Sequence, residues 1–152
     1  KRITYWPQLF LGLTFNWGIV MAWTAMTNTV SIDAITLYLA AIFWTLGYDT
    51  IYGVQDIVDD EIIGVKSTSI KFKKNIKLFV SICYFLSAIL ITCLFHGQLG
   101  LNNFTILVII FMLSLVYQVI KFKKNDPKKC LESFRLNNFS GSLLFFGIFL
   151  IN

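Results

Sequence analysis

Five apolar stretches, each close to the length of a membrane-crossing helix, constrain the fold of this chain more than any other feature. They cover residues 6–25, 32–48, 76–95, 104–120 and 136–151. A helix needs about 17–25 apolar residues to cross a bilayer, and only helices or closed barrels satisfy the backbone hydrogen bonds there. The stretches lack the alternation of barrel strands. The sequence therefore predicts an all-α, polytopic transmembrane helix bundle with about five spans, of which the second and fifth are short.

The basic residues divide the connections between these stretches into two kinds. All 13 Lys and Arg residues lie at the start of the chain, between the second stretch and the first turn of the third, or between the fourth and fifth. The connections around residues 27–33 and 96–103 contain none. The positive-inside rule therefore predicts that the basic groups lie on the cytoplasmic or matrix side of a bacterial or mitochondrial inner membrane, with Asn152 on the opposite side.

The charge distribution also limits the partners of the chain. The net charge of +5 favours contact with anionic head groups of the lipid bilayer. Because apolar stretches separate the basic groups, we expect no nucleic acid partner. The single His and the absence of a nucleophile paired with a base exclude hydrolytic triads. Asn137 and Asn138 are expected to begin the last helix.

The segment 48–61, with the sequence YDTIYGVQDIVDDE, is the candidate site. Its last six residues carry four carboxylates and no basic residue. At ~5 Å and an effective dielectric of ~20, two like charges repel by roughly 3 kcal/mol, so we expect a bound cation. Carboxylate oxygens without nearby His or Cys suit Mg²⁺, whose shell is commonly completed by substrate phosphates. The alternative is a solvated helix end with surplus acid.

The spacing of these residues predicts one aromatic and acidic face. If the segment is helical, Tyr48, Tyr52, Asp56 and Asp60 follow one another at intervals of four and share a face. Asp59 lies beside them. Charged side chains next to membrane spans are costly, so a cluster of this kind indicates a functional site.

Three stretches of the chain resemble the UbiA-type membrane prenyltransferases. Residues 48–70, YDTIYGVQDIVDDEIIGVKSTSI, resemble the second aspartate-rich motif of that family. Residues 1–8, KRITYWPQ, resemble the start of its fifth helix, and residues 130–141, CLESFRLNNFSG, the start of its last. All 152 residues align in order with the C-terminal half of the family. The resemblance implies that residues 1–152 are the C-terminal half of one membrane prenyltransferase domain, with helices five to nine present and the N-terminal half of the bundle missing.

The resemblance also implies roles for individual residues. Asp56 and Asp60 match the aspartates of the DxxxD motif, which in the family hold Mg²⁺ against the diphosphate of the isoprenoid donor. Aromatic faces at Tyr48 and Tyr52 are suited to stabilise an allylic cation. The implied catalytic residues are Asp56, Asp60 and Arg2; the metal ligands Asp56, Asp60 and Asp59; and the substrate-binding residues Lys1, Arg2, Lys66, Tyr48, Tyr52 and Asp49.

The implied reaction is Mg²⁺-dependent transfer of a polyprenyl group from polyprenyl diphosphate to an aromatic acceptor. The motifs are most similar to those of family members that act on 4-hydroxybenzoate in ubiquinone biosynthesis. The family's first motif, of the NxxxDxxxD kind, has no counterpart in these 152 residues. We therefore expect an N-terminal half of the same enzyme to act as a partner, and the isolated chain to be inactive.

The sequence is also compatible with three other functions. One is an inactive or partner-dependent half-protein. Another is a cation-coupled transporter, although such sites usually lie near the middle of the membrane on broken helices. The last is a phosphotransferase of the CDP-alcohol class, whose longer motif of Gly, Arg and Asp is absent here.

Overall fold

The computed structural model describes residues 1–151, which form helices joined by turns and contain no β-strand. The elements are α1 (Pro7–Phe15), α2 (Trp17–Thr27), α3 (Ile32–Tyr52), α4 (Ile57–Ile62), α5 (Thr68–Lys71), α6 (Ile76–Leu94), the 3-10 helix η1 (His96–Gln98), α7 (Asn103–Lys121) and α8 (Pro127–Phe149). The all-α prediction is confirmed. The predicted side of Asn152 falls outside the described residues.

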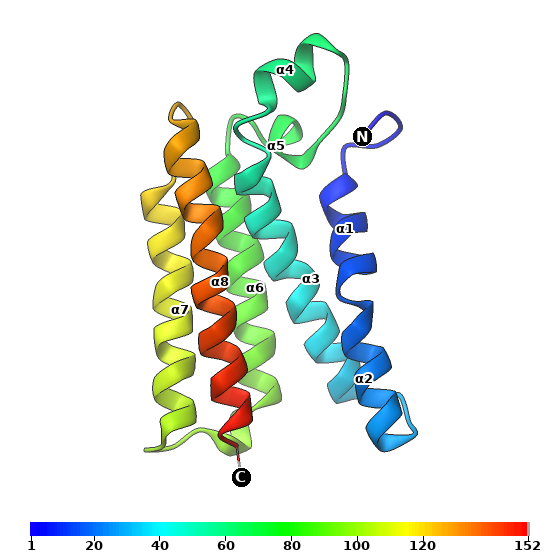
Figure 1. The fold of residues 1–152 in the computed structure, drawn as a ribbon, viewed down its shortest axis with the longest axis vertical. Helices are drawn as coiled ribbons and strands as arrows, with labels where there is room; N and C mark the ends of the chain where they lie inside the picture. The colour runs from blue at the N-terminus through cyan, green and yellow to red at the C-terminus, as the bar shows by residue number, and fades with distance from the viewer. Residues whose placement is uncertain (152) are drawn as a thin grey trace.

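The long helices lie side by side in an up-and-down bundle (Figure 1). Helix α3 packs against α6, α1 and α8, and α7 packs mainly against α8. The short helices α4 and α5 lie at one end of the bundle, together with the start of α1 and the connection between α7 and α8 (Figure 1). All three basic groups of the sequence are therefore gathered at this end, which we call the basic end.

Four segments in the described part of the chain are long and apolar enough to cross a membrane. They are Pro7–Thr27, Ile32–Tyr52, Ile76–Leu94 and Asn103–Lys121. Helix α8 also runs along the bundle beside α7 (Figure 1), but it is more polar because it begins at Pro127 and not near residue 136. The Asp126 side chain caps this earlier start by accepting a hydrogen bond from the Lys129 amide at 3.2 Å, and Pro127 occupies a favoured first position.

The first apolar stretch is interrupted at Asn16, between α1 and α2. The Asn16 side-chain amide donates hydrogen bonds to the Gly12 carbonyl and to Thr45 Oγ1, both at 2.8 Å. These bonds satisfy a polar side chain at membrane depth and tie the interruption to α3. A polar group there without partners would cost several kcal/mol.

A chain of buried hydrogen bonds joins three helices at the centre of the bundle. Tyr84 of α6 donates its hydroxyl to Gln118 Oε1 of α7 at 2.7 Å, and Gln118 Nε2 donates to Ser140 Oγ of α8 at 3.0 Å. The Tyr84 ring lies so close to α3 that a Cβ added at Gly47 would stand 2.5 Å from its Cε1 atom. Only glycine at position 47 leaves room for the Tyr84 ring in the position from which its hydroxyl bonds to Gln118.

We expect Gly47→Ala to destabilise the protein by about 1–3 kcal/mol, the usual cost of overpacking a core. The added methyl group displaces the Tyr84 ring and with it the bond to Gln118. The measurement is the midpoint of thermal unfolding in detergent. Gly18→Ala is the control, because Gly18 is also helical and a Cβ added there would meet nothing within 4 Å. Equal midpoints for the two variants would contradict the packing described.

Candidate functional site

The acidic segment is not one continuous helix, so the prediction of a single aromatic and acidic face is wrong. Helix α3 ends at Tyr52, the chain turns through residues 53–56, and α4 begins at Ile57. The turn lies directly against α5, where a Cβ added at Gly53 would stand 2.6 Å from Ser69 Oγ. This close approach leaves no room for a side chain at position 53, where α3 ends and the chain turns.

Asp56 and Asp60 nevertheless share one helical turn. The Asp60 amide donates to the Asp56 carbonyl at 2.8 Å, and side chains spaced in this way lie on one face. Asp60 is buried, with 7% of its surface exposed, and its carboxylate pairs with Lys1 Nζ at 3.2 Å. Asp49 lies close enough to Lys1 and Asp56 for their charges to act on its carboxylate. Asp49 and Asp60 therefore lie near Lys1, and Asp56 lies near Asp49.

The donor set fits part of a Mg²⁺ site. Within residues 1–151, no three His, Cys, Asp or Glu side chains come together closely enough to hold a metal ion alone. The Asp56 carboxylate forms no side-chain hydrogen bond to the described residues, and it offers oxygen ligands together with Asp60. Mg²⁺ takes six oxygen ligands and is commonly held by one or two carboxylates plus substrate phosphates. Two carboxylates on one turn match that pattern.

Lys66 lies beside Lys1 at the same end of the bundle. The Lys66 amide donates to the Lys1 carbonyl at 2.7 Å. The Lys66 ammonium lies 3.5 Å from the Ile3 carbonyl and 5.4 Å from the centre of the Tyr5 ring. Lys1 thus brings positive charge next to Asp60, and Lys66 adds a second ammonium at the same end of the bundle.

The remaining predicted residues form no side-chain hydrogen bond or ion pair with this group among the described residues. Tyr48 and Tyr52 pack against Phe134 of α8, with ring centres 5.8 and 4.8 Å apart. Arg2 and Asp59 are exposed. The tyrosines therefore connect α3 to α8 and do not continue the acidic face.

A set of buried polar residues that the sequence analysis did not single out holds the site in place. Gln8 has only 3% of its surface exposed, and its Oε1 accepts a hydrogen bond from the Thr68 amide at 3.0 Å. Thr50 and Thr68 share a hydrogen bond of 2.7 Å between their hydroxyls, and Ser69 Oγ donates to the Thr50 carbonyl at 2.8 Å. The sequence does contain one sign of this role, a glutamine near the start of an apolar stretch. A polar side chain next to a membrane span usually has a structural or functional partner.

A cleft of about 340 Å³ lies between the interruption at Asn16, helix α3 and helix α8. Its lining is both aromatic and polar: Phe15, Asn16, Trp44, Thr45, Tyr48, Phe134, Asn137 and Asn138. Trp44 Nε1 donates to Asn137 Oδ1 at 3.1 Å. Asn137 and Asn138 therefore lie within α8 and line a cleft, and the prediction that they begin this helix is wrong. Tyr48 joins the cleft to the acidic group, because Asp49 follows it in the chain.

The chain matches the UbiA prenyltransferase family over residues 1–146. It is 39% identical over 153 residues to the mitochondrial 4-hydroxybenzoate polyprenyltransferase of Aedes aegypti, covering 99% of this chain and 34% of that protein. The Bos taurus protein of the same name is 40% identical over 155 residues, covering 100% of this chain and 41% of the relative. The 4-hydroxybenzoate geranyltransferase 1 of Lithospermum erythrorhizon is 39% identical, covering 99% and 49%. The chain thus spans between a third and a half of these relatives, and no solved structure shows a significant match.

We expect Gln8→Leu to loosen the segment around α5. The substitution leaves the buried Thr68 amide without its acceptor, at a cost of about 1–3 kcal/mol. Tryptic cleavage after the lysines at 66–74 should then become faster, measured by limited proteolysis in detergent. Gln98→Leu, in the exposed connection at the other end of the bundle, should leave the cleavage rate unchanged. Equal rates for both variants would mean that Gln8 does not hold this segment.

Proposed function

The chain belongs to the UbiA prenyltransferase family, and from this membership we propose that it forms part of a Mg²⁺-dependent enzyme. The reaction is transfer of a polyprenyl group from polyprenyl diphosphate to an aromatic acceptor, 4-hydroxybenzoate, in ubiquinone biosynthesis. The observation that carries the proposal is the pair Asp56 and Asp60 on one helical turn beside Lys1. The names of the full-length relatives support the choice of acceptor.

The charged residues of the basic end would bind the diphosphate. Asp56 and Asp60 would hold Mg²⁺, which when bound stabilises the negative charge that develops on the leaving diphosphate. Lys1 pairs with Asp60 at 3.2 Å and keeps that carboxylate oriented. Lys66, linked to Lys1 through the backbone at 2.7 Å, adds a second positive charge for the same anion. Arg2 and Asp59 remain assigned to the site by the resemblance alone.

The cleft between α3 and α8 is the proposed location of the allylic group and the acceptor. Its Trp44, Tyr48 and Phe134 rings present aromatic faces, which stabilise a nearby cation by about 0.5–2 kcal/mol. The surrounding helices exclude water, which would otherwise capture the cation. The polar side chains of Asn16 and Asn137, which both line the cleft, are suited to orient a phenol.

The site requires residues beyond these 152, and we propose that they come from an N-terminal half of the same enzyme. Two carboxylates supply only part of a Mg²⁺ shell, and no second aspartate motif follows in the chain. The segment Pro7–Thr27 also exposes large apolar side chains such as Phe10, Phe15 and Met21, which partner helices or lipid would cover. In an inner membrane the basic end would face the cytoplasm or the matrix.

A cation-coupled transporter is less consistent with this arrangement. Asp56, Asp59 and Asp60 lie on or next to α4, at one end of the bundle (Figure 1). A transported ion would be expected to bind near the middle of the membrane, where the described helices carry no comparable acidic group.

We expect Asp56→Asn in the complete protein to lower kcat by at least about 100-fold, because removing one electrostatic stabiliser of a transition state commonly costs that much. The concentration of Mg²⁺ that gives half-maximal activity should rise. The measurement is prenyl transfer to 4-hydroxybenzoate in membranes at several Mg²⁺ concentrations. Glu61→Gln is the control, because Glu61 is exposed and paired with Lys73 at 2.7 Å. Near-normal turnover for Asp56→Asn would remove this residue from the site.

We expect the 152 residues expressed alone to give no prenylated product. Co-expression with an N-terminal half that carries the NxxxDxxxD motif should give activity that depends on both halves. The measurement is product formation in membranes from cells lacking the endogenous enzyme. Activity of the 152 residues alone would show that the described residues already form a complete site.

A further inference from the structure

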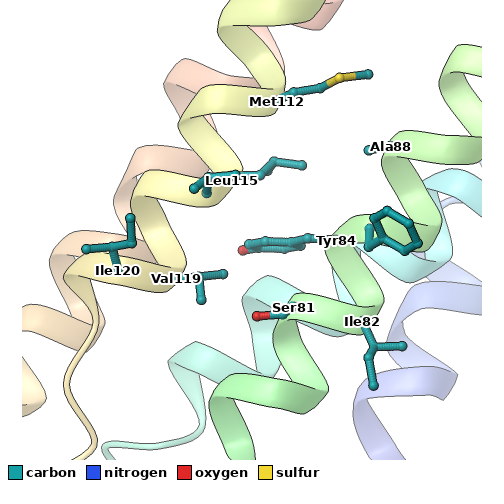
Figure 2. Close-up of a pocket in the computed structure, with 10 residues that line it drawn as sticks. Ser81, Ile82, Tyr84, Ala88, Met112, Leu115, Val119 and Ile120 are labelled. Carbon is teal, nitrogen blue, oxygen red and sulfur yellow. The ribbon is translucent and has the colours of Figure 1, made fainter.

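A groove of about 460 Å³ lies between α6 and α7, away from the acidic group. Figure 2 shows Ala88 and Tyr84 of α6 facing Met112 and Leu115 of α7 across it. Helices α6 and α7 touch little, since α6 packs mainly on α3 and α7 mainly on α8. The volume is within the ~300–1,000 Å³ typical of ligand sites.

The groove offers its occupant no free polar group. Among its lining residues only Ser81 and Tyr84 have polar side-chain atoms. The Ser81 hydroxyl donates to the Lys77 carbonyl at 2.8 Å, and the Tyr84 hydroxyl donates to Gln118 at 2.7 Å. Both are therefore satisfied within the protein, and an apolar chain is the chemistry that fits.

The groove lies in the half of the bundle next to the basic end. It runs from Ala88 to Ser81 along α6 and from Met112 to Ile120 along α7, which is about 10–12 Å at 1.5 Å per residue. One leaflet of hydrocarbon is about 15 Å thick. The groove is thus long enough to hold most of an acyl chain that extends from the head groups into one leaflet.

A lysine without an acidic partner stands at the mouth of the groove. Lys77 is one helical turn beyond Ser81, and its ammonium lies 5.3 Å from the centre of the Phe122 ring, just past the end of α7. Lys77 is exposed and forms no ion pair with residues 1–151. The nearby Lys121 is paired with Glu132 at 3.1 Å, while Lys123 and Lys124 are exposed. The net charge at the mouth is positive.

We propose that this groove binds an anionic phospholipid, with an acyl chain between α6 and α7 and the phosphate at Lys77. Basic pockets between helices on one side of a membrane are suited to anionic head groups. The acyl chain fits the groove because its lining offers no free polar group. The anionic head group matches the Lys77 ammonium, which has no acidic partner among the described residues. This inference is independent of the prenyl-transfer proposal, because it uses neither Asp56 nor Asp60.

The test measures retained lipid in the complete purified protein by native mass spectrometry. Dioleoyl phosphatidylglycerol and dioleoyl phosphatidylcholine are titrated separately, so that only the head group differs. The wild type should bind phosphatidylglycerol more tightly, and Lys77→Gln should weaken that binding about fivefold, the effect of one lysine near an anionic surface. Lys128→Gln is the charge control, because Lys128 is exposed at the same end but on α8.

A second pair of variants tests the groove itself. Ala88→Phe fills the groove and should weaken binding of both lipids, whereas Ile89→Phe, on the neighbouring exposed position of α6, should weaken neither. Val116→Phe provides a second groove-filling change on α7 should Ala88→Phe fail to fold.

Several results would overturn the proposal. They are equal binding of the two lipids by the wild type, an equal loss for Lys77→Gln and Lys128→Gln, or equal effects of Ala88→Phe and Ile89→Phe. Displacement of phosphatidylglycerol by geranyl diphosphate in a way that depends on Lys77 would assign the groove to the isoprenoid donor. A change of oligomeric state in Ala88→Phe without loss of lipid would assign it to a second copy of the chain.

Discussion

The hydrocarbon layer permits almost no unpaired polar group, and the organisation of the whole bundle follows from that constraint. Polar side chains inside the helices are paired across helices, as in the chain from Tyr84 through Gln118 to Ser140. Of the buried side-chain oxygen and nitrogen atoms in the described residues, only Ser87 Oγ and Ser133 Oγ lack a partner. Charged side chains, which no neighbour could neutralise in the hydrocarbon layer, are concentrated at the ends of the bundle, and the candidate site lies at one of these ends.

The same constraint explains how the site is supported. Asp56 and Asp60 lie at the start of and within the short helix α4, outside the spans, where Lys1 pairs with the Asp60 carboxylate. The next helix, α5, is held by hydrogen bonds to Thr68 from within the bundle, from Gln8 at the start of α1 and Thr50 near the end of α3. Rigid spans thereby position a charged segment that could not itself lie in hydrocarbon.

The sequence was sufficient for the fold class, the order of the spans and the family, because apolar length and basic clusters are local properties of the chain. It placed Asp56 and Asp60 correctly on one helical turn, because residues four apart lie on the same face even in a helix as short as α4. It failed at Gly53, where α3 ends and the turn packs closely against Ser69, sixteen residues away. It also missed the early start of α8 at Pro127, because hydropathy does not register a helix whose first turns are polar. The role of Gln8 could not be predicted, since its partner Thr68 is distant in sequence.

The turn at Gly53 has a consequence for how the protein is made. The hydrogen bonds that fix α5 and the ion pair that fixes Asp60 reach back to residues 1, 8 and 50, all of which precede them in the chain. When the ribosome releases residues 53–71, the helices that receive this segment have already been synthesised. The basic end of the molecule can therefore order during translation, before α6, α7 and α8 enter the bilayer.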